Sequence, residues 1–443
     1  MATKQLRKKL ISIFSKHKES LVSVSWLWLG SMTGAALTFV TQIILARVLG
    51  VDQFGKFSSA FAMVTLLAPL AGFGVAGFWL NAFGREGWQA QRWLPGSLRF
   101  LMFSTIFVLL LLWIWAWIGP HDTTTSRLLV ILSFHVFGVA AIELTGAKYQ
   151  LEGRHRYLAG LQLAPNLLRF ICVAFLLVLV QGAGGSKPQL IYVAMIFAAV
   201  AIIVLLFGAH QIGLMIRGRL ALEGHETLLE NASLNPAEQP GPWKVMSVSW
   251  PFGMAGLFYL IYFQSDIILI KYLVNESAVG IYSVAFVVMN AVYLFPSVLY
   301  QKFFLPRLHR WAHHAQDQLY RVYHIGNVTM LGSGLAAMVL LWLVAPVLLP
   351  VLFGVEYQAA VMLLIILSVA TPFRFVANSV GAVLTTRNHM RMKVRLMGAG
   401  ALVNIILNLG LIPVFGAVGA AVATVITEVL IMLMYFWYYR SVF

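Results

Sequence analysis

Long stretches without a charged residue recur along the whole chain and constrain its fold more than any other feature. Residues 100–118, 171–180 and 191–209 are examples. A helix needs about 20 apolar residues to cross the hydrocarbon layer of a membrane. Only 10% of the residues are charged, whereas about 25% is usual in a soluble domain. The sequence therefore predicts an all-α, polytopic membrane protein.

About twelve membrane spans are expected from these stretches. The six spans of the first half cover residues 22–46, 56–80, 98–118, 127–150, 160–181 and 189–216. The six spans of the second half cover residues 244–270, 279–301, 324–349, 357–385, 396–413 and 416–438. We therefore expect residues 1–216 to form a six-helix bundle with an N-terminal tail, and residues 244–443 to form a second one. Residues 217–243 contain several prolines and are typical of a cytoplasmic linker.

The basic residues predict the orientation of the chain in the membrane. Most of its 31 Lys and Arg residues lie in segments that the span assignment places on the side of the N-terminus. Lys and Arg are enriched in cytoplasmic loops of membrane proteins, so both termini are expected in the cytoplasm. The net charge of +16 is then explained without a nucleic-acid partner, and none is expected.

The chemistry-bearing residues exclude several classes of site. Cys172 is the sole cysteine and lies in an apolar span, so no internal disulfide or multi-thiolate metal site is possible. No nucleophile, acid and base constellation is visible, and no phosphate-binding loop has the required spacing. We therefore expect no enzyme activity, no metal and no cofactor.

One sequence motif occurs twice in the chain. The sequence QIILAR at residues 42–47 is matched by DIILIK at 266–271, and GKFSSAF at 55–61 is matched by GIYSVAF at 280–286. A weaker echo pairs the sequence ILS at 131–133 with ILS at 366–368. Because each predicted half has an even number of spans, the halves are parallel repeats, and a substrate path is expected between them.

The first copy of this motif resembles a known family. Residues 45–58 (LARVLGVDQFGKFS) and the glycine-rich stretch 71–74 (AGFG) are similar to the opening of polysaccharide-unit flippases in the multidrug, oligosaccharidyl-lipid and polysaccharide exporter superfamily. Residues 264–266 and 280–285 are similar to that family's seventh and eighth spans. These flippases move O-antigen units and other lipid-linked oligosaccharides.

The resemblance implies two six-helix bundles that form a V around a central cavity, which opens alternately to each side. It also implies a polyprenyl-diphosphate-linked oligosaccharide as substrate, contact with membrane lipids, a place in a bacterial cell inner membrane and a glycan polymerase as partner. Cation-coupled multidrug exporters of the superfamily share the helical plan and remain the alternative. A membrane-embedded glycosyltransferase would carry a large extramembrane catalytic domain, which the sequence does not show.

Ionisable residues inside the spans are candidates for function because a charge at the centre of a bilayer costs on the order of 2.5–3.5 kcal/mol. Arg374 and Asn378 are four residues apart in the tenth span and share a helix face. The weaker echo places Glu143 of the fourth span at the position that matches Asn378, and His135 shares its face. We expect the two faces to meet across the cavity, where Arg374 would bind diphosphate. The alternative is a structural Arg374 bonded to helix-end carbonyls or to a glutamate.

The fifth span carries a polar stripe of Gln162, Asn166 and Arg169 at spacings of four and three. Such a stripe lines either water or another helix. We expect Arg169 to face the cavity as a second cation for the substrate, and contact between helices is the alternative. Asn404 occupies the matching position in the eleventh span, and Asn408 follows one turn later.

Two acidic residues are candidates for coupling transport to an ion. Asp266 in the seventh span stands where the first copy of the motif has Gln42, and Glu428 lies in the last span. Each could bind a proton or sodium, and a salt bridge to a nearby Lys or Arg is the alternative.

Two further basic residues could line the cavity. Lys148 lies near the inner end of the fourth span, where it could instead snorkel to the interface. Arg47 lies at the outer end of the first span, where a cation also suits a helix C-terminus.

The two accounts of function differ in the charge of the cavity. A glycolipid flippase predicts a positive cavity built from Arg374 and Arg169. A multidrug antiporter predicts an acidic one built from Asp266, Glu143 and Glu428.

Overall fold

The computed structural model describes residues 2–182, 189–222, 239–300, 316–384 and 389–442. These residues contain helices and no β-strand. The central part of the linker predicted at 217–243 lies outside the described residues. Up to that gap the helices are α1 (Ala2–Leu67), η1 (Ala68–Leu70), α2 (Val75–Glu86), η2 (Gly87–Trp93), α3 (Leu94–Ile118), α4 (Thr123–Leu132), α5 (His135–Leu151), α6 (His155–Gly182) and α7 (Leu190–Ile216). After it come α8 (Pro242–Leu273), α9 (Glu276–Val298), α11 (Gln316–Phe353), η5 (Val355–Tyr357), α12 (Ala360–Ser368), α13 (Ala370–Val383), α14 (Met390–Phe415) and α15 (Ala417–Val442).

The predicted all-α polytopic membrane fold is confirmed. In the described part of the chain, nine helical segments are long and apolar enough to cross a membrane, or ten if the bent pair α12 and α13 forms one span. One of the nine, Leu27–Ile118, contains most of α1 together with α2 and α3. Helices satisfy all their backbone hydrogen bonds internally, which lipid requires. The total of twelve spans stays a prediction.

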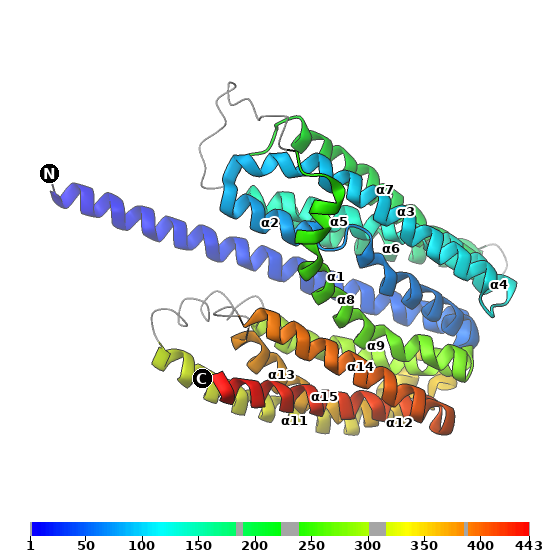
Figure 1. Cartoon of the computed structure of the whole chain (residues 1–443). Helices are drawn as coiled ribbons and strands as arrows, with labels where there is room; N and C mark the ends of the chain where they lie inside the picture. The colour runs from blue at the N-terminus through cyan, green and yellow to red at the C-terminus, as the bar shows by residue number, and fades with distance from the viewer. Residues whose placement is uncertain (1, 183–188, 223–238, 301–315, 385–388, 443) are drawn as a thin grey trace.

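Figure 1 shows the helices in two groups, with α1 and α8 between them. We call α2 to α7 the first helix group, and α9 with α11 to α15 the second helix group. Helix α1 packs against both α6 and α9, and α8 packs against α2 and α3 as well as against α14 and α9. The predicted domain boundary at residues 243 and 244 stays a prediction. Val245, near the start of α8, is buried in one apolar cluster with Trp79 and Trp93 from the first part of the chain.

A glycine breaks the first long helix where the sequence predicts a turn between two spans. Gly50 has φ 76° and ψ 172° inside α1, a conformation that residues with a Cβ atom rarely adopt. We call the end of the molecule that contains Gly50 the distal end. The chain termini marked in Figure 1 lie toward the opposite end.

The two segments of the weaker sequence echo are interrupted at matching points. The serine that ends each matched ILS sequence lies at an interruption of the helix. Ser133 lies between α4 and α5, and Ser368 is the last residue of α12, directly before the break to α13. The indole of Trp113 donates to the Ser133 hydroxyl over 3.0 Å, and the indole of Trp342 donates to the Ser368 hydroxyl over 2.8 Å. The repeat seen in the sequence therefore has a structural counterpart.

The glycines of the repeated motif lie at the distal contact between α1 and α9. A Cβ atom on Gly55 would lie 1.8 Å from the carbonyl oxygen of Glu276, and one on Gly280 would lie 2.1 Å from the carbonyl oxygen of Val51. These distances leave no room for a side chain. The two helices therefore meet backbone against backbone, with the hydroxyl of Ser277 donating to Asp52 beside them over 3.4 Å.

Further polar contacts join helices at the distal end. The indole of Trp115 on α3 donates to the hydroxyl of Tyr272 on α8 over 2.9 Å. Asp122 caps α4 by accepting from the backbone N–H of Thr125 over 3.0 Å, and Lys56 donates to it over 2.8 Å. Partial burial alone would raise the pKa of Asp122, but the hydrogen bonds from Lys56 and Thr125 lower it to about 2. Asp122 is therefore a carboxylate at neutral pH.

We expect Gly55→Ala to destabilise the protein, because the added methyl group must push the backbone of α9 away from α1. Overpacking of this kind costs about 1–3 kcal/mol, which a lower thermal unfolding midpoint of the detergent-purified protein would report. Gly84 on α2 is the matched control, since a Cβ atom there would meet nothing within 4 Å. Gly84→Ala is expected to leave the midpoint unchanged or to raise it. Equal midpoints for Gly55→Ala and wild type would contradict the close contact.

Candidate functional site

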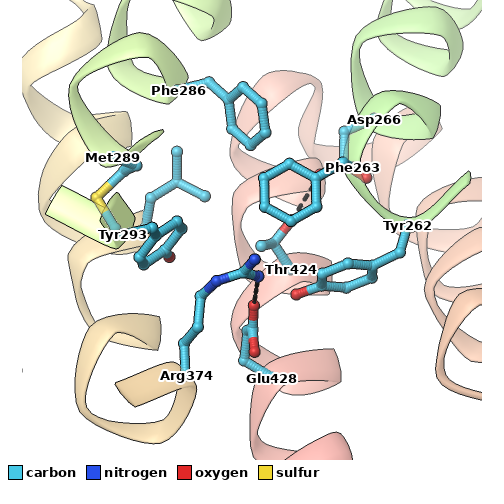
Figure 2. A pocket seen from close by; sticks show the side chains of 10 residues that line it. Tyr262, Phe263, Asp266, Phe286, Met289, Tyr293, Arg374, Thr424 and Glu428 are labelled. Carbon is cyan, nitrogen blue, oxygen red and sulfur yellow. Dashed lines mark hydrogen bonds and ion pairs between the residues drawn. The ribbon is translucent and has the colours of Figure 1, made fainter. Parts of the chain in front are cut away.

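A small cavity lies in the second helix group and is closed on one side by α8. Its volume is about 10 Å³, which is about the space that one water molecule needs. Figure 2 shows an arginine and a glutamate facing each other in it, surrounded by aromatic rings. The lining residues come from α8, α9, α12, α13 and α15, and they are Tyr262, Phe263, Asp266, Phe286, Met289, Tyr293, Leu367, Arg374, Thr424 and Glu428.

Arg374 is paired within this cavity. Its Nη1 atom donates to Oε1 of Glu428, and the side chains are 12% and 2% exposed respectively. The guanidinium carbon lies 4.4 Å from the ring centroids of both Phe263 and Tyr293, close enough for a cation–π attraction. The structure therefore gives Arg374 a glutamate partner on α15. A bond to a glutamate is what the structural role of Arg374 predicts.

Asp266 is buried beside this pair and accepts three hydrogen bonds. The hydroxyls of Tyr282 and Thr424 donate to Oδ2 over 2.7 and 2.6 Å, and Nδ2 of Asn408 donates to Oδ1 over 2.6 Å. The same Asn408 amide also donates to Asn404 over 3.0 Å. Within the described residues no Lys or Arg forms an ion pair with Asp266, so only neutral donors stabilise its carboxylate.

Some members of this network were missed by sequence reasoning. Thr424 precedes Glu428 by four residues and therefore shares its helix face, a spacing that could have revealed it. The role of Tyr282 had no comparable signal, because it depends on how α9 packs against α8.

The charges around the cavity do not balance. Two carboxylates, Asp266 and Glu428, and one guanidinium, Arg374, line the same small volume. With all three groups ionised the set carries one excess negative charge, and a buried charge without a counterion is costly. The site can remove that cost by taking up a proton or a monovalent cation.

The first helix group contains Arg169, the second arginine that the sequence places inside a predicted span. Nη2 of Arg169 on α6 lies 3.2 Å from Nδ1 of His135 on α5, and its guanidinium carbon lies 4.9 Å from the ring centroid of Phe197. Nε of Arg169 is buried without a hydrogen-bond partner in the described part of the structure. No carboxylate there forms an ion pair with Arg169, so its positive charge is not neutralised. An imidazole that accepts at Nδ1 is neutral.

The two arginines do not share a site. Arg169 contacts His135 and Phe197, whereas Arg374 contacts Glu428 and aromatic rings of α8 and α9. Glu143 is exposed on α5 and forms no ion pair with any described residue. The predicted apposition of Arg374 and Glu143 stays a prediction.

The remaining polar candidates lie elsewhere. The hydroxyl of Ser31 on α1 donates to Oε1 of Gln162 over 3.2 Å, and Nδ2 of Asn166 donates to the backbone oxygen of Gln162 over 3.2 Å. Gly34 on α1 lies so close that a Cβ atom there would be 3.1 Å from Nδ2 of Asn166. This part of the α6 stripe therefore faces another helix. Asn378 is half-buried on α13.

The two outlying basic candidates both have partners. Lys148 is 2% exposed, with its Nζ atom 3.2 Å from Glu152 and 3.0 Å from the amide oxygen of Gln211. Arg47 donates from Nε to the backbone oxygen of Leu352 over 2.7 Å and from Nη2 to that of Val351. These carbonyls belong to the last turn of α11, which has no further residues to bond them. Arg47 therefore caps a neighbouring helix.

Comparison with known proteins identifies the family. Residues 20–312 match the family described as polysaccharide biosynthesis protein, a range that covers more than half of the chain. The chain belongs to this family. The resemblance drawn from residues 45–58 is thereby confirmed.

A curated relative and several solved structures are similar to this polysaccharide biosynthesis protein over nearly its whole length. The probable low-salt glycan biosynthesis flippase Agl15 of Haloferax volcanii is 25% identical over 410 residues, which cover 90% of this chain and 79% of the relative. The solved structure of the lipid II flippase MurJ in an inward closed conformation has a TM-score of 0.71 at 13% identity, covering 94% of this chain and 87% of that one. A multidrug resistance MATE family transporter in an inward-facing conformation has a TM-score of 0.62 at 12% identity, with coverages of 92% and 94%. At these identities the two structures show a shared fold.

In this family member, we expect Arg374→Met to be strongly destabilising, because it leaves Glu428 buried without its partner. Removal of one member of a buried ion pair costs about 3–5 kcal/mol, whereas replacement of both members by apolar residues is often neutral. The double variant Arg374→Met with Glu428→Met is therefore expected to recover most of the lost thermal stability. A single variant as stable as wild type, or a double variant no better than the single one, would contradict the pairing.

Proposed function

We propose that this protein is a flippase that moves a polyprenyl-diphosphate-linked oligosaccharide across the membrane by alternating access, for the synthesis of a surface polysaccharide. The alignment with a glycan biosynthesis flippase along 90% of the chain carries the proposal. The family match and the fold shared with MurJ support it. The protein then acts as a transporter and makes or breaks no covalent bond.

The physical task of such a protein is to carry sugars and a diphosphate through hydrocarbon. Unpaired polar groups cost several kcal/mol each in that environment. In the proposed mechanism the sugars and diphosphate pass between the two helix groups while the polyprenyl tail stays in lipid. Solved structures with this fold are described as inward-facing and as outward-facing, which supports movement of one group against the other.

We assign recognition of the diphosphate to Arg169 rather than to Arg374. A guanidinium binds phosphate through paired, charge-assisted hydrogen bonds. The charge of Arg374 is already neutralised by Glu428, so a second anion would meet no net positive charge there. Arg169 has no carboxylate partner among the described residues, and its Nε donor is unused. His135, as a neutral neighbour, leaves the charge of Arg169 available to the substrate.

We also place the protein in a bacterial cell inner membrane with both termini in the cytoplasm. The distribution of Lys and Arg along the chain supports this orientation. A glycan polymerase that consumes the flipped substrate is the expected partner.

The test of the transport proposal is a flipping assay with a fluorescent polyprenyl-diphosphate oligosaccharide in proteoliposomes that hold the full chain. We expect Arg169→Gln to slow flipping by about tenfold or more, since a hydrogen bond to a charged group contributes about 1.5–3 kcal/mol. The matched control is Arg85→Gln, which removes the same charge from an exposed position on α2 and is expected to flip at the wild-type rate. Wild-type flipping by Arg169→Gln would overturn the assignment. Transport of cationic dyes in place of the glycolipid would favour the multidrug exporter.

We further propose that the cavity lined by Asp266, Arg374 and Glu428 couples transport to an ion. The support is the excess negative charge of this buried set and its space of about one water molecule, which suits a proton or a sodium ion. The oxygen atoms of Thr424 and of the asparagine Asn408 beside Asp266 are ligands that hard cations accept. The acidic set is also what the multidrug alternative expects, so the coupling site does not by itself identify the cargo.

For this coupling site, we expect Asp266→Asn to abolish the response of flipping to an imposed sodium or proton gradient. The amide keeps the shape of the carboxylate but removes the excess charge that binds the ion. The gradient-driven rate should therefore fall to the rate without a gradient, measured in the same proteoliposomes. Asp122→Asn is the control, because it removes a carboxylate at the distal end while asparagine still caps a helix. Full gradient dependence in Asp266→Asn would exclude this carboxylate as the coupling group.

A further inference from the structure

A second and much larger cavity lies on the first helix group. Its volume is about 540 Å³, within the usual range for small-molecule pockets of about 300–1,000 Å³. It runs between α3, α4 and α7, and we call it the α3–α4–α7 groove. Its lining residues are Trp113, Ala116, Trp117, Ser126, Arg127, Val130, Ile131, Ile191 and Met195.

The groove lies on the side of α3 that faces away from α8. Trp113 and Trp117 line it, whereas Trp115 donates a hydrogen bond to Tyr272 of α8. Residues two apart on a helix point in nearly opposite directions, because each residue turns the helix by about 100°. Helix α3 therefore separates the groove from the place where the two helix groups meet. A substrate that passes between the groups does not enter the groove.

The lining of the groove is amphipathic along its length. Most of its wall is aliphatic or aromatic, and Trp117, which is 89% exposed, is of a type enriched at the boundary between hydrocarbon and headgroups. The polar residues Ser126 and Arg127 lie in the first turns of α4, near the distal end. Arg127 is exposed and forms no ion pair with any described residue. The nearby carboxylate of Asp122 is already engaged by Lys56 and Thr125.

We propose that the α3–α4–α7 groove is a binding site for an anionic phospholipid, with one acyl chain against its apolar wall and the phosphate at Arg127. The wall matches a hydrocarbon chain, and the guanidinium at its polar end matches a phosphate in charge and in hydrogen-bonding geometry. A lipid with a net negative charge neutralises Arg127. A zwitterionic lipid brings its own cation and does not. The proposal is independent of the transported substrate.

The test is native mass spectrometry of the detergent-purified full chain after addition of phosphatidylglycerol or phosphatidylcholine. Wild type is expected to retain phosphatidylglycerol preferentially. Arg127→Gln is expected to weaken its retention by about fivefold, the size of the effect of one basic residue at an anionic membrane surface. Val130→Trp, which fills the groove and keeps the arginine, is expected to weaken retention of the same lipid. Arg217→Gln is the matched control, since it removes an exposed arginine beyond α7 and should change nothing.

Three results would overturn the proposal. The first is equal retention of both lipids by wild type, and the second is unchanged retention of phosphatidylglycerol in Arg127→Gln or in Val130→Trp. The third is displacement of phosphatidylglycerol by polyprenyl phosphate in a manner that depends on Arg127, which would assign the groove to the isoprenoid carrier. Because lipid retention is measured without transport, failure here leaves the proposed flippase activity untouched.

Discussion

The cost of a charge in a low-dielectric interior governs the arrangement of this protein. Arg374 is balanced by Glu428, and Lys148 is balanced by Glu152. The same constraint makes the unbalanced groups informative. Asp266 is stabilised only by neutral donors, and Arg169 has no carboxylate partner among the described residues. Such exceptions inside a membrane are retained where a ligand or an ion completes the balance. The carboxylate lies on α8 beside the second helix group and the guanidinium lies in the first group, so the proposed ion site and the proposed anion site are separate in space.

Sequence reasoning predicted the fold and the candidate residues because both depend on local properties. Apolar stretches must become helices in lipid, and ionisable residues within them are few. It could not predict the partners of these residues. Spacing along one helix tells which side chains share a face, but not which helix that face meets. The partner of Arg374 is 54 residues away, on α15, whereas the weaker repeat pointed toward Glu143. A simple truncation of Arg374 would therefore disturb stability together with any effect on substrate.

The two copies of the motif share a backbone contact but not an acidic residue. Gly55 and Gly280 occupy matched positions and permit the same close approach of two backbones. In the weaker echo, Ser133 and Ser368 each accept a hydrogen bond from a tryptophan where the helix is interrupted. The close backbone contact at these glycines is therefore found in both copies. The acidic charge is not, since the position of Asp266 in the second copy is a glutamine in the first, whereas the basic residue of the motif is kept as Arg47 and Lys271. The duplication therefore supplies a similar scaffold twice, and the carboxylate of the proposed ion site occurs in the second copy alone.

Helix α8 packs against both helix groups. Its first turns are buried with residues of α2 and η2, and its later turns pack against α9 and α14. Between them lie Pro251, which cannot donate a helical hydrogen bond, and Gly253, whose backbone nitrogen lies only 2.4 Å from where a Cβ atom on Gly74 would be. A movement of one helix group relative to the other would therefore act on α8, and the backbone hydrogen bond missing at Pro251 makes this segment the place where α8 bends at the lowest cost.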